Sequence, residues 1–139
     1  LSLLLLGPPE KILAMAEISE GQVDRFCAAL FHYTNGAKAI LESSIEVATP
    51  VEAYIYGASG SIKLHKNFHH SEKMTLHKAG KETQIIEKEY TGNGYYHEIL
   101  EVQSCLKQGK IESDKMPHSM SLDLIRTLDA IREKIGLNY

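Results

Sequence analysis

The chain has 139 residues, of which 43% are hydrophobic and 24% charged, and its formal net charge is -3. This length can bury one core without disulfides or metals, so a single domain over residues 1–139 is expected. Lysine and arginine are not clustered, which argues against a nucleic-acid partner because a phosphate-binding surface needs concentrated positive charge.

The first element is the apolar segment of residues 1–6, which runs into Gly7-Pro8-Pro9. A membrane span requires roughly 20 apolar residues, so no membrane partner is expected. Glycine and proline stop a helix, and we interpret the segment as the last turns of a buried helix that begins upstream of Leu1. The chain is therefore expected to be a piece of a longer protein.

Strands are predicted to follow this segment. Residues 24–34 are apolar on both faces of a strand, and residues 37–47 alternate between polar and apolar. Between them, Asn35-Gly36 predicts a hairpin with a type I′ turn, because both residues tolerate positive φ. The remaining strands are expected at residues 11–19, 51–56, 61–64, 73–78 and 83–88.

Two helices are predicted after the strands. The first carries apolar residues at helical spacing and ends at Gly109, and the second is capped by Ser119 or Ser121 and ends at Gly136. Their apolar stripes are Tyr95, Ile99, Val102 and Leu106 in the first, and Leu124, Leu128, Ile131 and Ile135 in the second.

This order of elements predicts an α+β fold. A mostly antiparallel or mixed sheet of about six strands would have the C-terminal helices packed on one face. The other face would stay open, and the doubly apolar strand at residues 24–34 makes it available for dimerisation. A homodimer or higher homo-oligomer is therefore expected through the open sheet face.

A glycine-rich turn over residues 92–94 precedes the first predicted helix. It is similar to the start of a dinucleotide-binding loop, but His97 stands where the third glycine belongs, so no cofactor site is expected in this chain. The turn could instead form a substrate-pocket wall at a helix N-terminus, where backbone donors favour polar or anionic ligands. In the structural alternative, the tyrosines pack and Asn93 caps the helix. The pocket candidates are Tyr90, Asn93, Tyr96 and His97.

No metal site and no catalytic residue are expected. The histidines at 65, 69, 70 and 77 lie among lysines, without a cysteine at ligand-like spacing. Cys27 and Cys105 lie in apolar stretches outside any Cys-His motif, and we expect both to be buried thiols. So few cysteines fit the reducing cytoplasm.

Several segments together resemble the C-terminal domain of the Gfo/Idh/MocA oxidoreductases, especially the dihydrodiol dehydrogenase-like branch. The resemblance covers essentially the whole chain, and it depends on the order and spacing of its pieces. These pieces are Leu1-Ser-Leu-Leu-Leu-Leu-Gly-Pro-Pro, Tyr33-Thr-Asn-Gly-Ala, Gly57-Ala-Ser-Gly60-Ser-Ile, Gly94-Tyr-Tyr-His-Glu98 and Cys105-Leu-Lys-Gln-Gly-Lys-Ile-Glu-Ser113.

This resemblance implies that the chain is half of an enzyme. The missing half would be an N-terminal Rossmann domain that binds NAD or NADP and carries the catalytic residues. The present chain would shape the pocket for a sugar, cyclitol or related alcohol or ketone, and would mediate oligomerisation. The isolated chain is expected to fold but to be inactive. The alternative is a non-enzymatic sugar-binding or regulatory scaffold domain with the same fold.

Overall fold

The computed structural model describes residues 1–89, 91–92 and 94–137. These residues form seven strands, three α-helices and one short 3₁₀ helix, and the chain divides into two compact units. The first unit comprises Leu1–Ala48 and Lys110–Tyr139, and the second comprises Thr49–Gly109. The expected α+β class is confirmed, but the strands form two sheets where one was predicted.

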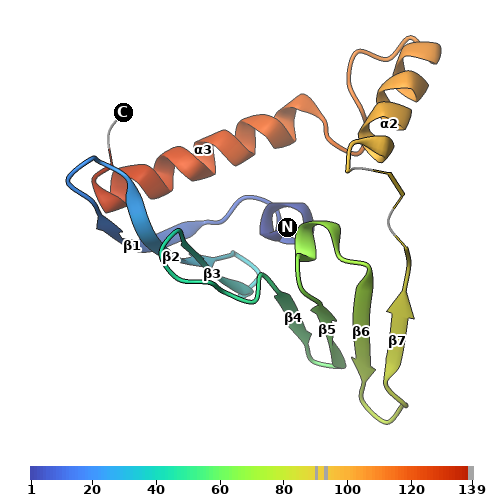
Figure 1. Cartoon of the computed structure of the whole chain (residues 1–139), viewed down its shortest axis with the longest axis horizontal. Coiled ribbons are helices and arrows are strands. Elements are labelled where there is room, and N and C mark those ends of the chain that lie inside the picture. The colour runs from blue at the N-terminus through green and yellow to red at the C-terminus, as the bar shows by residue number, and fades with distance from the viewer. Residues whose placement is uncertain (90, 93, 138–139) are drawn as a thin grey trace. The chain divides into compact units, whose positions relative to one another are not determined.

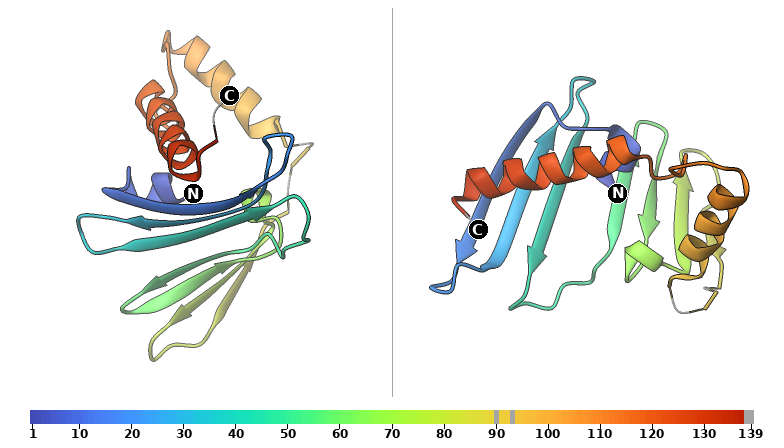
Figure 2. Two further views of the ribbon diagram at one scale, coloured as in Figure 1. Left: turned by 90° about the vertical axis from the view of Figure 1, so that its left-hand side faces the viewer. Right: turned by 90° about the horizontal axis from the view of Figure 1, so that it is seen from above.

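The first unit is a three-stranded antiparallel sheet with one long helix on it (Figures 1 and 2). The short helix α1 precedes the sheet, and α3 packs along β1. The elements are α1 (Ser2–Leu6), β1 (Lys11–Ile18), β2 (Asp24–His32), β3 (Lys38–Ser44) and α3 (His118–Ile135).

The core of this unit lies between the sheet and α3. Ile12 pairs with Phe31 across β1 and β2, and both are buried together with Ala29 and Tyr33. Ala130 and Ile131 of α3 pack against this cluster. Because the small alanines leave room for the helix, α3 can lie close to the sheet.

The hairpin between β2 and β3 was predicted correctly, but its turn type was not. The N–H of Gly36 donates to the carbonyl of Tyr33 (2.9 Å), and the N–H of Tyr33 donates to the carbonyl of Ala37 (3.1 Å). Within this turn only Gly36 has positive φ, at 82°, so the turn is type I followed by a glycine bulge. Asn35 instead accepts a hydrogen bond from the Ala37 N–H through its side chain (3.0 Å), which holds the longer loop.

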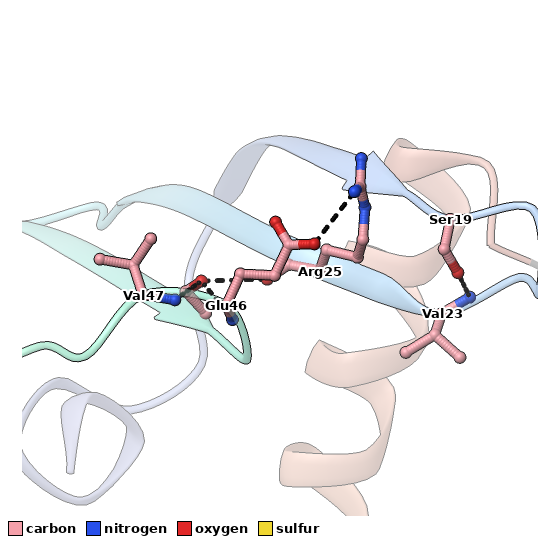
Figure 3. A network of polar contacts seen from close by, with 6 residues as sticks. Ser19, Val23, Arg25, Glu46 and Val47 are labelled. Atoms are coloured by element: carbon pink, nitrogen blue, oxygen red, sulfur yellow. Dashed lines mark hydrogen bonds and ion pairs between the residues drawn. The ribbon is translucent and has the colours of Figure 1, made fainter.

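A polar network closes the other end of β2 and β3 (Figure 3). Ser44 Oγ donates to the carbonyl of Arg25 (3.1 Å) and accepts from the N–H groups of Glu46 and Val47 (3.1 Å each). Arg25 Nη1 also lies 3.0 Å from Glu46 Oε1. The network satisfies the backbone where β3 ends, so the chain leaves the sheet in a defined direction.

The second unit is a four-stranded antiparallel sheet with strands in chain order. Gly57 and Gly60 face each other across the tight turn between the first two strands. No helix of the described residues packs extensively on this sheet. The elements are β4 (Ala53–Gly57), β5 (Gly60–Leu64), η1 (Phe68–His70), β6 (Lys73–Lys78), β7 (Gln84–Glu87) and α2 (Tyr96–Lys107).

The cap of α3 and the face that it buries differ from the prediction. α3 begins after Pro117, and its first N–H is bound by the carboxylate of Glu112 (2.6 Å) instead of by Ser119 or Ser121, which lie inside the helix. The face of α3 toward the sheet is centred on Thr127, which leaves Leu124 and Leu128 partly exposed because the leucine stripe lies to one side of the contact.

The apolar side chains of α1 and α2 are also exposed. Leu4 and Leu5 of α1 and Ile99 and Leu106 of α2 face water, although α1 was expected to be buried and α2 to pack on the sheet. Among the described residues, no helix has the length and apolar character needed to cross a membrane. Of the helices in the described part of the chain, α3 alone covers a sheet face, as predicted.

Candidate functional site

Two of the four predicted pocket residues can be placed. Tyr90 and Asn93 lie outside the described residues, whereas Tyr96 and His97 are the first two residues of α2. The rings of Tyr96 and His97 are in edge-to-face contact, with centroids 5.2 Å apart and planes at 79°. The structure thus brings these two side chains together at an exposed helix start.

Glycine allows the turn that leads into this helix. Gly92 and Gly94 have φ values of 74° and 99°, which L side chains rarely adopt. A Cβ on Gly92 would also stand 3.3 Å from the Cβ of Tyr96. The turn thus brings Gly92 close to Tyr96 at the start of the helix.

The electrostatics of this helix start favour a neutral ligand over an anion. The N-cap residue is Tyr95, whose side chain makes no capping hydrogen bond. Backbone N–H groups at this end favour negative charge, but Glu98 already supplies a carboxylate in the first turn. A hydroxyl-bearing molecule could bind the phenol and imidazole groups without competing with Glu98.

Sequence reasoning missed a second polar cluster, on one face of the four-stranded sheet. Tyr54 and Lys63 are paired across β4 and β5. Tyr54 Oη donates to Glu52 Oε2 (2.7 Å), and Lys63 Nζ lies 3.0 Å from Glu52 Oε1. The Lys63 ammonium is also 5.2 Å from the centre of the Tyr54 ring.

These contacts shift the pKa values of Glu52 and Lys63 in opposite directions. Hydrogen bonds from Tyr54 and Lys63 lower the pKa of Glu52. The Tyr54 hydroxyl and the Glu52 carboxylate raise the pKa of Lys63. Both groups are thus held in their charged forms at neutral pH. In the sequence, the alternation of residues 52, 54 and 56 could have indicated that these side chains share one face of the strand.

The same face carries further fixed side chains. The rings of Tyr54 and Tyr56 are stacked, with centroids 6.1 Å apart and an interplanar angle of 7°. His65 Nε2 lies 2.8 Å from Thr75 Oγ1, and His77 Nδ1 lies 2.8 Å from the Thr83 hydroxyl. These pairs satisfy one nitrogen of each histidine within the sheet.

A small hollow lies in the first unit, where the end of α1 meets the start of α3. Its volume is about 160 Å³, less than the several hundred Å³ of a typical small-molecule site. It therefore does not suit a sugar-sized ligand. Its lining residues are Leu3, Gly7, Pro8, Pro117, Ser119, Met120 and Asp123.

The structure also places the cysteines and histidines. Cys27 and Cys105 are free, half-buried thiols, and burial together with Asp24 raises the pKa of Cys27. Its thiolate is therefore disfavoured at neutral pH, as in an unreactive structural cysteine. Within the described ranges, no three metal-ligating side chains gather in one place.

Comparison with known proteins agrees with this fold. Residues 1–63 match the family model of the GFO/IDH/MocA C-terminal domain. The trans-1,2-dihydrobenzene-1,2-diol dehydrogenase of Mus musculus is 29% identical over 136 residues, which cover 94% of this chain and 40% of the relative. The Xenopus tropicalis protein of the same name is 25% identical over 138 residues, covering 94% and 41%. The chain thus spans about two fifths of these relatives.

Solved structures share the fold at lower identity. Levoglucosan dehydrogenase in complex with NADH and levoglucosan matches with a TM-score of 0.74 at 15% identity, over 97% of this chain and 45% of that one. An oxidoreductase from Agrobacterium radiobacter in complex with NAD+, L-tartaric acid and magnesium matches with a TM-score of 0.74 at 14% identity, over 97% and 43%. The family model over residues 1–63, the curated relatives and the fold agree, and the chain is similar to the C-terminal domain of the GFO/IDH/MocA oxidoreductases.

Proposed function

We propose that this chain is the substrate-side domain of an NAD(P)-dependent oxidoreductase that acts on a sugar, cyclitol or related alcohol or ketone. The observation that carries the proposal is the similarity over 94% of the chain to dihydrodiol dehydrogenases, of which it spans about two fifths. Hydride transfer would require the remaining part of such a protein, because orientation of cofactor and substrate is the source of the rate.

The dinucleotide does not fit the residues of this chain. The turn before α2 has glycine at 92 and 94, but it continues with Tyr95 and Tyr96 in place of a backbone that can approach phosphate closely. NAD or NADP would therefore be bound by a domain outside these residues. The isolated chain is expected to have no turnover. We place the enzyme in the cytoplasm, which supplies both cofactors.

We assign the start of α2 to the wall of the substrate pocket. Tyr96 and His97 offer a phenol and an imidazole beside a carboxylate that disfavours anions. Such groups can orient the hydroxyls of a neutral polyol by hydrogen bonds, each worth about 0.5–1.5 kcal/mol. No proton-transfer role is assigned to them.

Cofactor binding tests the proposal directly. NADH and NADPH are titrated into the 139-residue chain and into a product that also contains the remaining part of the relatives' length. The longer product should bind NADH or NADPH and should oxidise or reduce polyol substrates. The short chain should neither bind these cofactors nor turn over substrate. Turnover by the short chain would refute the division of labour. A longer product without cofactor binding would favour the sugar-binding or regulatory scaffold.

A matched pair of variants tests the pocket wall in the longer product. Tyr96→Phe should raise KM about three- to tenfold, because one substrate hydrogen bond is lost. Tyr95→Phe, which removes a hydroxyl from the exposed neighbouring tyrosine, should leave KM unchanged. Equal effects of the two variants would remove Tyr96 from the pocket.

The oligomerisation part of the proposed role falls on the three-stranded sheet. α3 covers one face of this sheet, and the apolar side chains of the other face are exposed. We therefore assign oligomer contacts to that open face.

A further inference from the structure

The helix α2 leaves its apolar side exposed to water. Ile99, Val102 and Leu106 follow one another at spacings of three and four residues, so they form one row along the helix, the α2 stripe. These side chains are 53%, 57% and 71% exposed, whereas Glu101 and Cys105 on another side of the helix are half-buried. An amphipathic helix in a complete fold has the reverse pattern, with its apolar side covered.

A helix of this kind needs a packing partner. α2 has 12 residues, a length at which an isolated helix is only marginally stable in water. Its stability therefore has to come from burial of its apolar side. Within the part of the chain that the structure describes, no strand or other helix packs extensively on α2. The α2 stripe is thus available as a docking surface.

The length of the curated relatives points to the occupant of this surface. The similarity covers 94% of this chain but 40% of the Mus musculus relative and 41% of the Xenopus tropicalis relative. A protein of that length has more chain outside the present residues than within them. This remaining part is long enough to form a further domain with a surface for α2.

The α2 stripe also continues into the proposed pocket wall. Tyr96 and His97 begin α2, and Ile99 lies about one turn after Tyr96. In the proposed enzyme, the remaining part of the protein binds the cofactor and must bring it to the substrate at this end of the helix. The same part therefore has to approach α2. A second copy of the chain, or its own sheet, could cover the stripe without bringing a cofactor.

We propose that the α2 stripe docks on the cofactor-binding part of the longer product, and that Val102, at the middle of the stripe, is a positioning residue for the reaction. Because α2 is one continuous helix, docking of the stripe fixes where Tyr96 and His97 stand relative to the cofactor. The inference rests on the proposed function and adds to it the contact that joins the pocket wall to the cofactor.

Thiol labelling tests the docking. Val102→Cys introduces a thiol into the stripe, and the matched control Ser104→Cys introduces one on the other side of the helix. A maleimide should modify position 102 at least about tenfold more slowly in the longer product than in the 139-residue chain, because a docked stripe excludes the reagent. Position 104 should react equally fast in both. Peptide mass spectrometry follows each position separately from the native cysteines.

Two labelling results would overturn the docking. The first is an equal rate at position 102 in the two products. The second is slow labelling at position 102 already in the 139-residue chain, which would mean that its own sheet or a second copy covers the stripe.

Kinetics of the longer product test the positioning role. Val102→Glu should lower kcat/KM for polyol substrates at least about tenfold, because a carboxylate in the apolar contact would displace the pocket wall. The dissociation constant of NADH should stay within about twofold, since the remaining part of the protein binds it. Val102→Ile, which keeps the contact apolar, and Ser104→Glu should both match the wild type. Circular dichroism checks that each variant is folded.

The kinetic outcomes separate this inference from the proposed function. An unchanged kcat/KM in Val102→Glu would overturn the positioning role. A wild-type longer product that binds no NADH would overturn the proposed function, and the labelling rates would still decide whether the stripe is docked.

Discussion

Gly60 is the position where the second sheet leaves least room for a side chain. A Cβ there would lie 2.0 Å from the carbonyl oxygen of His77 on the neighbouring strand. Gly60→Ala should therefore lower the free energy of unfolding by about 2 kcal/mol or more, because backbone must move. Gly57→Ala is the control, since its Cβ would be at an ordinary 3.7 Å from Gly60 O. Chemical denaturation checks both, and equal effects would contradict the close approach.

The Glu52–Lys63 pair predicts how stability depends on pH. The pKa of Glu52 is lowered on folding, so its contribution is present above its unfolded value of about 4.3 and is lost as pH falls through the folded value. The pKa of Lys63 is raised on folding, so its contribution to stability is lost as pH rises, and only in strongly alkaline solution. Glu52→Gln should therefore lower the melting temperature at pH 7 and have less effect at pH 3.

The control for this measurement is Glu82→Gln, at an exposed carboxylate in the turn between β6 and β7. It should change the melting temperature little at either pH. A Glu52→Gln effect that is equally large at pH 3 would show that the carboxylate acts through packing instead of charge.

At the scale of elements, α3 depends on a cap supplied from the preceding loop. Glu112 Oε2 accepts the His118 N–H at 2.6 Å and lies 3.6 Å from His118 Nδ1. Glu112→Ala should reduce the free energy of unfolding by about 1 kcal/mol, the usual cost of a lost N-cap. Glu133→Ala, near the other end of the helix, should stay within about 0.5 kcal/mol. Urea denaturation compares them, and an unchanged Glu112→Ala would contradict the cap.

This cap also shows what the sequence could and could not predict. The strands were found within a few residues, because alternation and turn residues are local signals. The cap of α3 was missed because Glu112 lies six residues before the N–H that it binds. The type I turn was missed because its central residues are Thr34 and Asn35, one position earlier than the Asn35-Gly36 pair of the predicted type I′ turn. The Glu52 cluster needed the register of β4 and β5, which only the folded sheet supplies.

At the scale of the whole molecule, burial is concentrated in the first unit. Every buried residue among those described belongs to that unit, including Ile12, Phe31 and Leu137. The second unit has a complete hydrogen-bonded ladder but no comparable core among the described residues. Its apolar side chains on β5 and β6 therefore gain less from folding than those around α3.

This difference predicts unequal protection in hydrogen–deuterium exchange of the 139-residue chain. Amides of β2, the central strand under α3, should exchange slowest, because opening them requires loss of the core. Amides of β5, which is also a central strand, should exchange at least about tenfold faster, so ladder position alone cannot explain the contrast. In the longer product proposed above, protection of β5 should rise if another part of the protein covers its sheet. Equal protection of β2 and β5 in the short chain would mean that the second sheet is already stabilised by itself.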